Sequence, residues 1–230
     1  MSLLSKSALP LLITFSVLTS GCALLEEMER KQAAARQRRA DAALQQSARI
    51  EHAAWRDLGG WKKHTYRNKA LLEQATPDNV SLEISLKEQR GLLLVRGAIA
   101  MDFPVSTGKA SHPTPPGSYT IRAKEKDYRS NLYGRILDAT GAVVVADADA
   151  RKDTPPEGGR FEGAAMPYWM RLTDSGVGLH VGHVPGGRAA SHGCIRLKKA
   201  NAEEIFSLVK IGTPVVVVAG DLPALSPQTP

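Results

Sequence analysis

The feature that most constrains the fold is an alternation of apolar and polar residues that begins just after Asn79. The alternating apolar residues are Val80, Leu82, Ile84 and Leu86. A period of two places one set of side chains on one face of a β-strand. Further strands, bounded by Gly and Pro turns, are predicted at Leu92–Val95, Ala98–Val105, Ser118–Ile121, Tyr168–Leu172, Val177–Val181 and Pro214–Val218. Residues 79–220 are therefore predicted to form one mostly β domain.

Two parts of this region depart from the strand pattern. Residues 138–163 are rich in Gly, Asp and Pro, which favours loops, with a hairpin around Gly141. Asn201 is followed three residues later by Glu204, the spacing of a helix capping box, and Gly212 would end that helix. One or two short helices are therefore expected beside the strands.

A different composition precedes the β region. Ala23–Leu58 contains no Gly or Pro and is rich in Ala, Gln, Glu and Arg, which predicts one long helix. Its apolar stripe is thin, which favours a solvated spacer over a partner-binding or self-associating helix. Residues 22–78 are thus interpreted as a helical spacer and connector, with another short helix after Trp61. The Pro-rich tail, residues 221–230, is predicted to be disordered.

The N-terminus has the features of an export signal. Lys6 precedes Ala8–Leu18, an apolar run too short to span a bilayer, and the run leads to Gly21-Cys22. Small residues directly before a cysteine resemble the lipobox of bacterial lipoproteins, which implies a signal peptide at 1–21 and lipidation of Cys22. Ala23 resembles the residue that follows the cysteine in lipoproteins sent to the outer membrane. The expected location is the periplasm, lipid-anchored at the inner leaflet of the outer membrane. A plain secretory signal or a retained anchor is the alternative.

The candidate catalytic residues lie close to one cysteine in the sequence. The chain has 2 Cys, and lipidation of Cys22 would leave Cys194 without an intrachain partner, which marks it as a reactive thiol. His180, His183 and His192 precede it closely, and an imidazole within reach activates a thiol. The flexible Gly193 permits a tight turn that could aim the amides of Gly193 and Cys194 at a developing oxyanion.

A zinc site is the alternative for the same residues. Two of these histidines with Cys194 could supply three ligands. Neither a carboxylate nor a second cysteine accompanies them, and one Cys with one His suffices for acyl transfer. No metal and no cofactor is therefore expected.

Ser191-His192-Gly193-Cys194, with His180 upstream, resembles the signature of the L,D-transpeptidase catalytic domain, the YkuD family. Other segments resemble the family in the same order, namely Gln89, Phe103–Gly108, Thr114–Tyr119, Met166–Trp169 and Gly212–Val215. The resemblance covers Asn79–Ala219. It implies a β-sandwich or barrel, and attack of a cysteine on the bond between the third residue and the terminal D-alanine of a peptidoglycan stem tetrapeptide. A thioester would form and pass to an amine acceptor, and carbapenems would acylate the cysteine.

The resemblance also implies roles for individual residues. Cys194 is the nucleophile and His180 is the catalytic base, with His183 as its rival. His192 and Gly193 shape the site, and the guanidinium of Arg196 suits a substrate carboxylate. Two further assignments are less specific: Ser191 lies in the turn and is grouped with substrate binding, and Tyr168 lines the cleft or belongs to the core.

Several functions remain open at this stage. The formal net charge of +7 suits solubility or attraction to an anionic wall polymer, and the chain has no nucleic-acid motif. The expected partners are peptidoglycan stem peptides, the membrane through the lipid, and an envelope lipoprotein as acceptor. An L,D-carboxypeptidase, or a hydrolase of lipoprotein–peptidoglycan links, is the first alternative. A non-catalytic lipoprotein that tethers peptidoglycan is the second, although a tether has no use for a thiolate.

Overall fold

The computed structural model describes the backbone of residues 11–225 and the side chains of residues 23–225. The chain forms two compact units, Met1–Leu44 and Gln45–Pro230. Helix α1 (Leu11–Asp57) runs through the first unit, and its last turns belong to the second. The predicted long helix is confirmed and ends as expected before Gly59, whose φ of 78° is left-handed and stops the helix.

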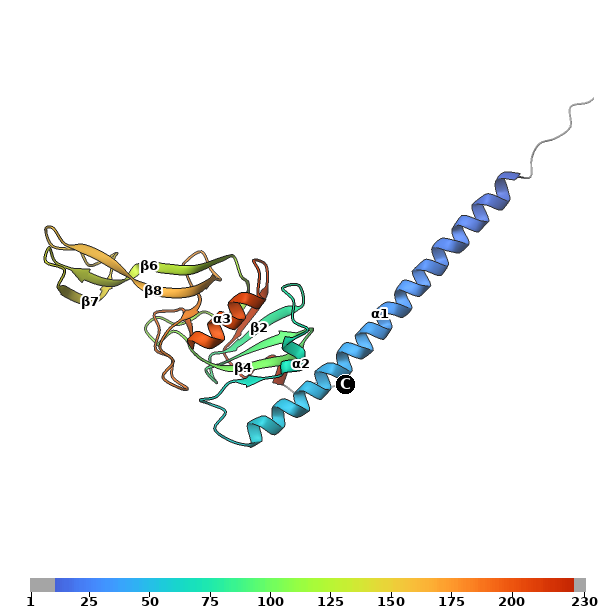
Figure 1. Ribbon diagram of the computed structural model, residues 1–230. Helices are drawn as coiled ribbons and strands as arrows, with labels where there is room; N and C mark the ends of the chain where they lie inside the picture. The colour runs from blue at the N-terminus through green and yellow to red at the C-terminus, as the bar shows by residue number, and fades with distance from the viewer. Residues whose placement is uncertain (1–10, 226–230) are drawn as a thin grey trace, which may run out of the picture. The chain divides into compact units, whose positions relative to one another are not determined.

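The second unit is built on a sheet of 11 strands (Figure 1). The order across the sheet is β5-β11-β2-β3-β4-β10-β9-β8-β6-β7, and β1 pairs with β4. The strands are β1 (Tyr66–Arg67), β2 (Val80–Ser85), β3 (Arg90–Val95), β4 (Ala98–Ser106), β5 (Gly117–Thr120), β6 (Ala123–Leu137), β7 (Val143–Asp149), β8 (Arg160–Arg171), β9 (Gly178–Val181), β10 (Ile195–Leu197) and β11 (Pro214–Val218). The helices are α2 (Lys69–Leu72), α3 (Lys199–Leu208) and a 3-10 turn at Pro223–Leu225. The prediction of a mostly β fold with few helices is confirmed.

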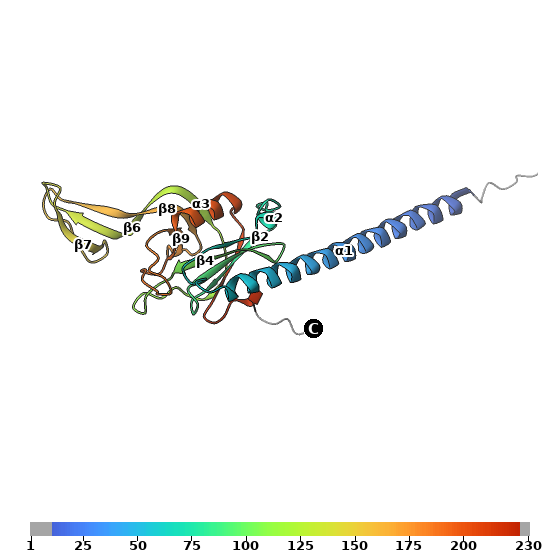
Figure 2. The same ribbon diagram turned by 60° about the horizontal axis from the view of Figure 1, so that its bottom comes forward.

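The core lies around the central strands. Every residue of β3 and β4 is buried, and β2 is buried at alternate positions, as its sequence pattern predicts. Helix α3 lies beside β8 and β9, which are labelled next to it in Figure 2. Strand β10 pairs with β4 on one side and with β9 on the other, which brings residues near 195 next to residues near 180.

Residues 138–163, predicted to be mostly loop, are loop over most of their length, but β7 and the start of β8 also lie within them. Strands β6 and β8 pair antiparallel along most of their length, and β7 pairs with the distal half of β6. These three strands extend as a narrow ribbon from the rest of the sheet, labelled β6, β7 and β8 in Figure 1. The predicted hairpin at Gly141 exists and connects β6 to β7. A ribbon with two solvated faces lacks the apolar alternation that identifies a strand in a sequence.

The end of α1 is buried against the sheet. Asp102 of β4 is 0% exposed and receives hydrogen bonds from His52 (2.7 Å, Nε2 to Oδ2), Arg90 (2.7 Å, Nε to Oδ1) and Arg56 (2.9 Å, Nη2 to Oδ2). Burial alone would raise the pKa of Asp102, but the His52 hydrogen bond and the two guanidinium charges lower it below its ordinary value. The last turns of α1 are therefore part of the β unit, and not a solvated spacer.

Two local predictions near the C-terminus are wrong. Asn201 does not cap α3, because the helix begins at Lys199 and the Asn201 side chain is buried against Thr65 and Arg67. The tail does not become irregular at Asp221: Leu222 is 0% exposed and packs in a cluster with Tyr66, Leu92 and Ile99. Residues 226–230 lie outside the described part of the chain.

Candidate active site

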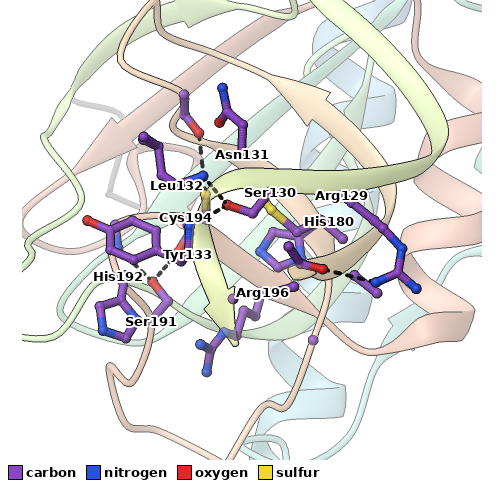
Figure 3. Close-up of a pocket in the computed structure, with 18 of the residues that line it drawn as sticks. Arg129, Ser130, Asn131, Leu132, Tyr133, His180, Ser191, His192, Cys194 and Arg196 are labelled. Carbon is purple, nitrogen blue, oxygen red and sulfur yellow. Dashed lines mark hydrogen bonds between the residues drawn. The ribbon is translucent and has the colours of Figure 1, made fainter. Parts of the chain in front are cut away.

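Most of the residues singled out in the sequence line one cavity of about 900 Å³. It is lined by β6 and β8 of the ribbon, by β9, and by the turn that precedes β10. Figure 3 shows Cys194, His180 and Arg196 together with residues of β6, such as Ser130 and Tyr133, around the same space. The ribbon that the sequence did not predict therefore forms one wall of the cavity.

Strand pairing explains why Cys194 and His180 share this cavity. Strands β9 and β10 are parallel, and His180 is the register partner of Arg196. Cys194 directly precedes β10, two residues before Arg196, and all three residues line the same cavity. His183 lies past the end of β9 and is exposed, whereas His180 is 7% exposed. The register thus favours His180 over His183 as the partner of the thiol.

The tautomer of His180 follows from one hydrogen bond. Its Nδ1 lies 2.8 Å from the carbonyl oxygen of Val181, and a carbonyl only accepts, so Nδ1 carries the proton. Nε2 then holds a free lone pair. Burial lowers the pKa of His180 to about 4; the hydrogen bond to Val181 opposes this change and the charge of Arg196 adds to it. The imidazole is therefore neutral at pH 7 and can accept a proton.

The Cys194 thiol is also neutral at rest. Burial raises its pKa, and this outweighs the amide of Gly178 and the charge of Arg196, both of which lower it. Its Sγ lies 3.5 Å from the carbonyl oxygen of Gly176, to which the thiol donates. The resting pair is thus a thiol and a neutral imidazole, and not the thiolate–imidazolium pair found in some cysteine enzymes.

The turn before Cys194 is held by its own hydrogen bonds. The Ser191 hydroxyl donates to the carbonyl of Cys194 and accepts the amide of Gly193 at 3.1 Å. Gly193 has a φ of 114°, which disfavours any other residue. Ser191 is 1% exposed, forms its hydrogen bonds within the turn and also lines the cavity, and its grouping with substrate binding stays a prediction. Of the two amides predicted as oxyanion donors, that of Gly193 is engaged and that of Cys194 remains the candidate.

His192 connects this turn to the ribbon. Its ring stacks on Tyr133 of β6 at 4.8 Å between centroids, and its Nε2 accepts a hydrogen bond from Lys109 at 3.1 Å. Asp147 of β7 lies 3.7 Å from the same nitrogen. Burial, and then the charge of Lys109, lower the pKa of His192. His192 therefore shapes the site by contact with the ribbon, and Tyr133 is a lining residue that the sequence did not reveal.

Of the two further residues predicted to bind substrate, Arg196 lines the cavity and Tyr168 does not. The stem of Arg196 passes close to Gly182, and the residue lines the cavity together with Cys194. Tyr168 is absent from the cavity lining; its hydroxyl donates to Glu203 at 3.0 Å and its ring packs on Phe206 of α3. Tyr168 therefore lies outside this cavity, and its role in substrate binding stays a prediction. Its φ of 56° is left-handed, which interrupts the alternation of side chains along β8.

Two further predictions concern metals and the N-terminus. Within residues 23–225, the structure contains no group of three or more His, Cys, Asp or Glu side chains arranged to hold a metal ion. The side chain of Cys22, the predicted lipidation site, lies outside the described residues. None of the helices in the described part combines the length and apolar character needed to cross a membrane.

The fold and the cavity together define a β domain in which a histidine of β9 and a cysteine that directly precedes the parallel strand β10 line one cavity. Residues 79–217 match the model of the L,D-transpeptidase catalytic domain, YkuD, and the chain belongs to this family. The segments that resemble the family in the sequence, from Gln89 to Val215, fall within this range.

Individual relatives carry the same name. "Probable L,D-transpeptidase 3" of Mycobacterium tuberculosis is 33% identical over 119 residues, which is 50% of this chain and 38% of the relative. "L,D-transpeptidase 1" of the same species is 31% identical over 127 residues, 53% of this chain and 43% of the relative. A solved structure of an L,D-transpeptidase from Mycobacterium smegmatis has a TM-score of 0.46 and 26% identity, covering 61% of this chain and 59% of that one. The chain thus spans less than half the length of the two curated relatives.

Proposed function

We propose that this protein is an L,D-transpeptidase that acts on peptidoglycan stem peptides, with Cys194 as nucleophile and His180 as base. The observation that supports the proposal is that His180 of β9 and Cys194, which directly precedes the adjacent parallel strand β10, line a single cavity. Membership of the L,D-transpeptidase family supports the same reaction.

The acylation step follows from the neutral resting pair. The Cys194 thiol attacks the carbonyl carbon of the third stem residue while its proton passes to Nε2 of His180, because Nδ1 is already protonated. The carbonyl oxygen becomes an oxyanion, which the amide of Cys194 would stabilise. When the intermediate collapses, the C–N bond to D-Ala breaks, and His180 returns the proton to the departing amine. A thioester on Cys194 remains.

The second half of the reaction, the transfer of the acyl group from Cys194, is the reverse of acylation with a new amine. The acceptor amine attacks the thioester carbonyl and gives a proton to His180, and the C–S bond then breaks. The sulfur takes up the proton, so the thiol and the neutral imidazole are restored. A thioester suits this exchange because it lies between two amides of comparable free energy. Arg196, a guanidinium in the same cavity, would bind a carboxylate of the stem.

We also propose the cellular setting, which rests on the sequence alone. Ala8–Leu18 followed by Gly21-Cys22 supports an export signal and a lipid on Cys22. The domain would then work in the periplasm, anchored to the outer membrane, and an envelope lipoprotein would be one of its acceptors. Replacing Cys22 by Ser and following processing of the precursor tests the anchor: a Cys22→Ser chain that is still processed and still carries lipid would exclude it.

The direct test of the reaction uses the full chain, purified in detergent, with disaccharide-tetrapeptide. Mass spectrometry of the products is compared with a Cys194→Ala control. A dimer formed with loss of one D-Ala identifies a transpeptidase. A tripeptide monomer with free D-Ala identifies an L,D-carboxypeptidase instead. If the substrate is unchanged by the wild-type protein, the proposed reaction is wrong for this donor.

A further inference from the structure

Thr114 has no assigned role in the reaction, yet its hydroxyl bridges two parts of the active-site turn. The residue is 3% exposed. Its Oγ1 accepts the amide of Gly108 at 2.8 Å and lies 2.7 Å from the carbonyl oxygen of Gly193. Since a carbonyl only accepts, the Thr114 hydroxyl donates its proton to Gly193. Both bonds together define the direction of this hydroxyl.

The geometry of the peptide unit extends this contact to Cys194. The carbonyl of Gly193 and the amide N–H of Cys194 belong to one planar group and point in opposite directions. A hydrogen bond that holds the Gly193 oxygen therefore also sets the direction of the Cys194 N–H. Gly193 itself is glycine with a φ of 114°, so its backbone would otherwise have unusual freedom to rotate.

The Thr114 hydroxyl is itself held on a rigid support. A Cβ on Gly108 would lie 2.1 Å from the carbonyl oxygen of His112, so the chain folds back tightly here. The carbonyl of Thr107 accepts the amides of Ala190 and Ser191, both at 3.0 Å, and the amide of Lys109 donates to Ser191 at 3.0 Å. The segment that carries Gly108 is thus clamped to the segment that leads into the nucleophile.

We infer that Thr114 is a positioning residue for acyl transfer: its hydroxyl orients the Gly193–Cys194 peptide so that the Cys194 amide points at the oxyanion. The inference rests on the proposed function, in that it assumes a carbonyl attacked by Cys194. It does not depend on which acceptor takes the acyl group. The Gly193 amide, which is engaged by Ser191, cannot take over the task without breaking the turn.

The test separates oxyanion stabilisation from thiol placement. Two reagents are compared on the full chain: imipenem, which acylates a thiol through a tetrahedral oxyanion, and iodoacetamide, which alkylates it by displacement of iodide without one. Thr114→Val keeps the shape of the side chain and removes the hydroxyl, and Thr114→Ser keeps the hydroxyl. Rates are read as mass adducts on Cys194, and thermal melting verifies that each variant is folded.

The expected result is a loss of about 10-fold to 100-fold in the acylation rate of Thr114→Val, somewhat less than the loss of a whole oxyanion donor. Its alkylation rate should stay within about twofold of wild type, and Thr114→Ser should recover most of the acylation, because the donor is restored. Equal acylation by wild type and Thr114→Val would overturn the inference. So would a parallel loss in both reactions, which would mean that Thr114 only places the sulfur.

The two proposals fail in different ways. If wild type leaves the tetrapeptide unchanged but is acylated by imipenem, the proposed donor substrate is wrong, and the Thr114 comparison with imipenem still decides the inference. If wild type is alkylated normally but is acylated by neither compound, both proposals are overturned.

Discussion

Nδ1 of His180 donates its proton to the carbonyl oxygen of Val181, the next residue in the chain, at 2.8 Å. A neighbouring backbone carbonyl thus performs the orienting task that a carboxylate performs in a Ser-His-Asp triad. It selects the tautomer without adding a negative charge, which agrees with an imidazole that stays neutral at pH 7.

The first prediction concerns the identity of the base. His180→Gln should lower kcat/KM for the tetrapeptide by about 10² to 10⁴, because a general base is lost. His183→Gln is the matched control: it changes an exposed histidine of the same cavity and should alter the rate only a few-fold. Steady-state kinetics of the two variants decide the matter, and the opposite ranking would assign the base to His183.

The second prediction concerns pH. Because the pKa of His180 is lowered to about 4, the acid limb of the acylation rate should have its midpoint near pH 4, well below the ordinary 6.5. Between these values the folded state binds fewer protons than the unfolded state, so the contribution of His180 to stability grows as pH rises from 4 to 6.5. Imipenem acylation followed across the acid range and up to neutral pH is the measurement. A midpoint near 6.5 would contradict a buried, neutral base.

The third prediction concerns the nucleophile. Cys194→Ala should abolish both acylation and turnover while the thermal melt stays close to wild type, because a small, half-buried group is replaced by one of similar size. The mass of intact protein after incubation with imipenem checks this. An adduct of equal yield on the Cys194→Ala chain would place the reactive group elsewhere.

The fourth prediction concerns the buried cluster at the end of α1. Asp102→Asn leaves Arg90, which is 1% exposed, without its counter-charge, and should lower the free energy of unfolding by about 3–5 kcal/mol. Asp221→Asn is the matched control, since it breaks an exposed pair with Lys87 and should cost less than about 1 kcal/mol. Urea unfolding of both variants gives the comparison. A similar loss in the two would mean that the Asp102 cluster is not a stabilising anchor.

The fifth prediction concerns Tyr168. Tyr168→Phe removes its hydrogen bond to Glu203 and should reduce stability slightly, while KM for the tetrapeptide is unchanged, because the ring faces α3. Steady-state kinetics and a thermal melt measure the two effects. A large rise in KM at constant stability would support the role in substrate binding.

The sequence predicted the central strands well because they are buried on one or both faces. The alternation from Val80 to Ile84 and the apolar β4 strand report directly on burial. The ribbon was missed for the opposite reason, since Ala123–Leu137 is polar on both faces and gains its structure from pairing with β8. Its Tyr133, which stacks on His192, could not be found without that pairing.

In the candidate site too, some residues could be predicted from the sequence and others depend on tertiary contacts. Cys194 and His180 were proposed from their motif, and the structure brings both into one cavity. Tyr168, proposed from a motif, lies outside the cavity and contacts Glu203 and Phe206, and its left-handed φ could not be foreseen from that motif. Asn201 was read as a cap because its spacing to Glu204 fits, but tertiary contacts with Thr65 and Arg67 occupy its side chain.

The raised pKa of Cys194 has a consequence outside the reaction itself. The thiolate, and not the thiol, attacks peroxides and disulfides, so a cysteine kept as a thiol is oxidised slowly. In the proposed mechanism, Cys194 becomes strongly reactive only when a carbonyl lies against it and His180 removes the proton in the same step. In an oxidising compartment, an enzyme of this kind can wait for substrate without a reductant to repair it.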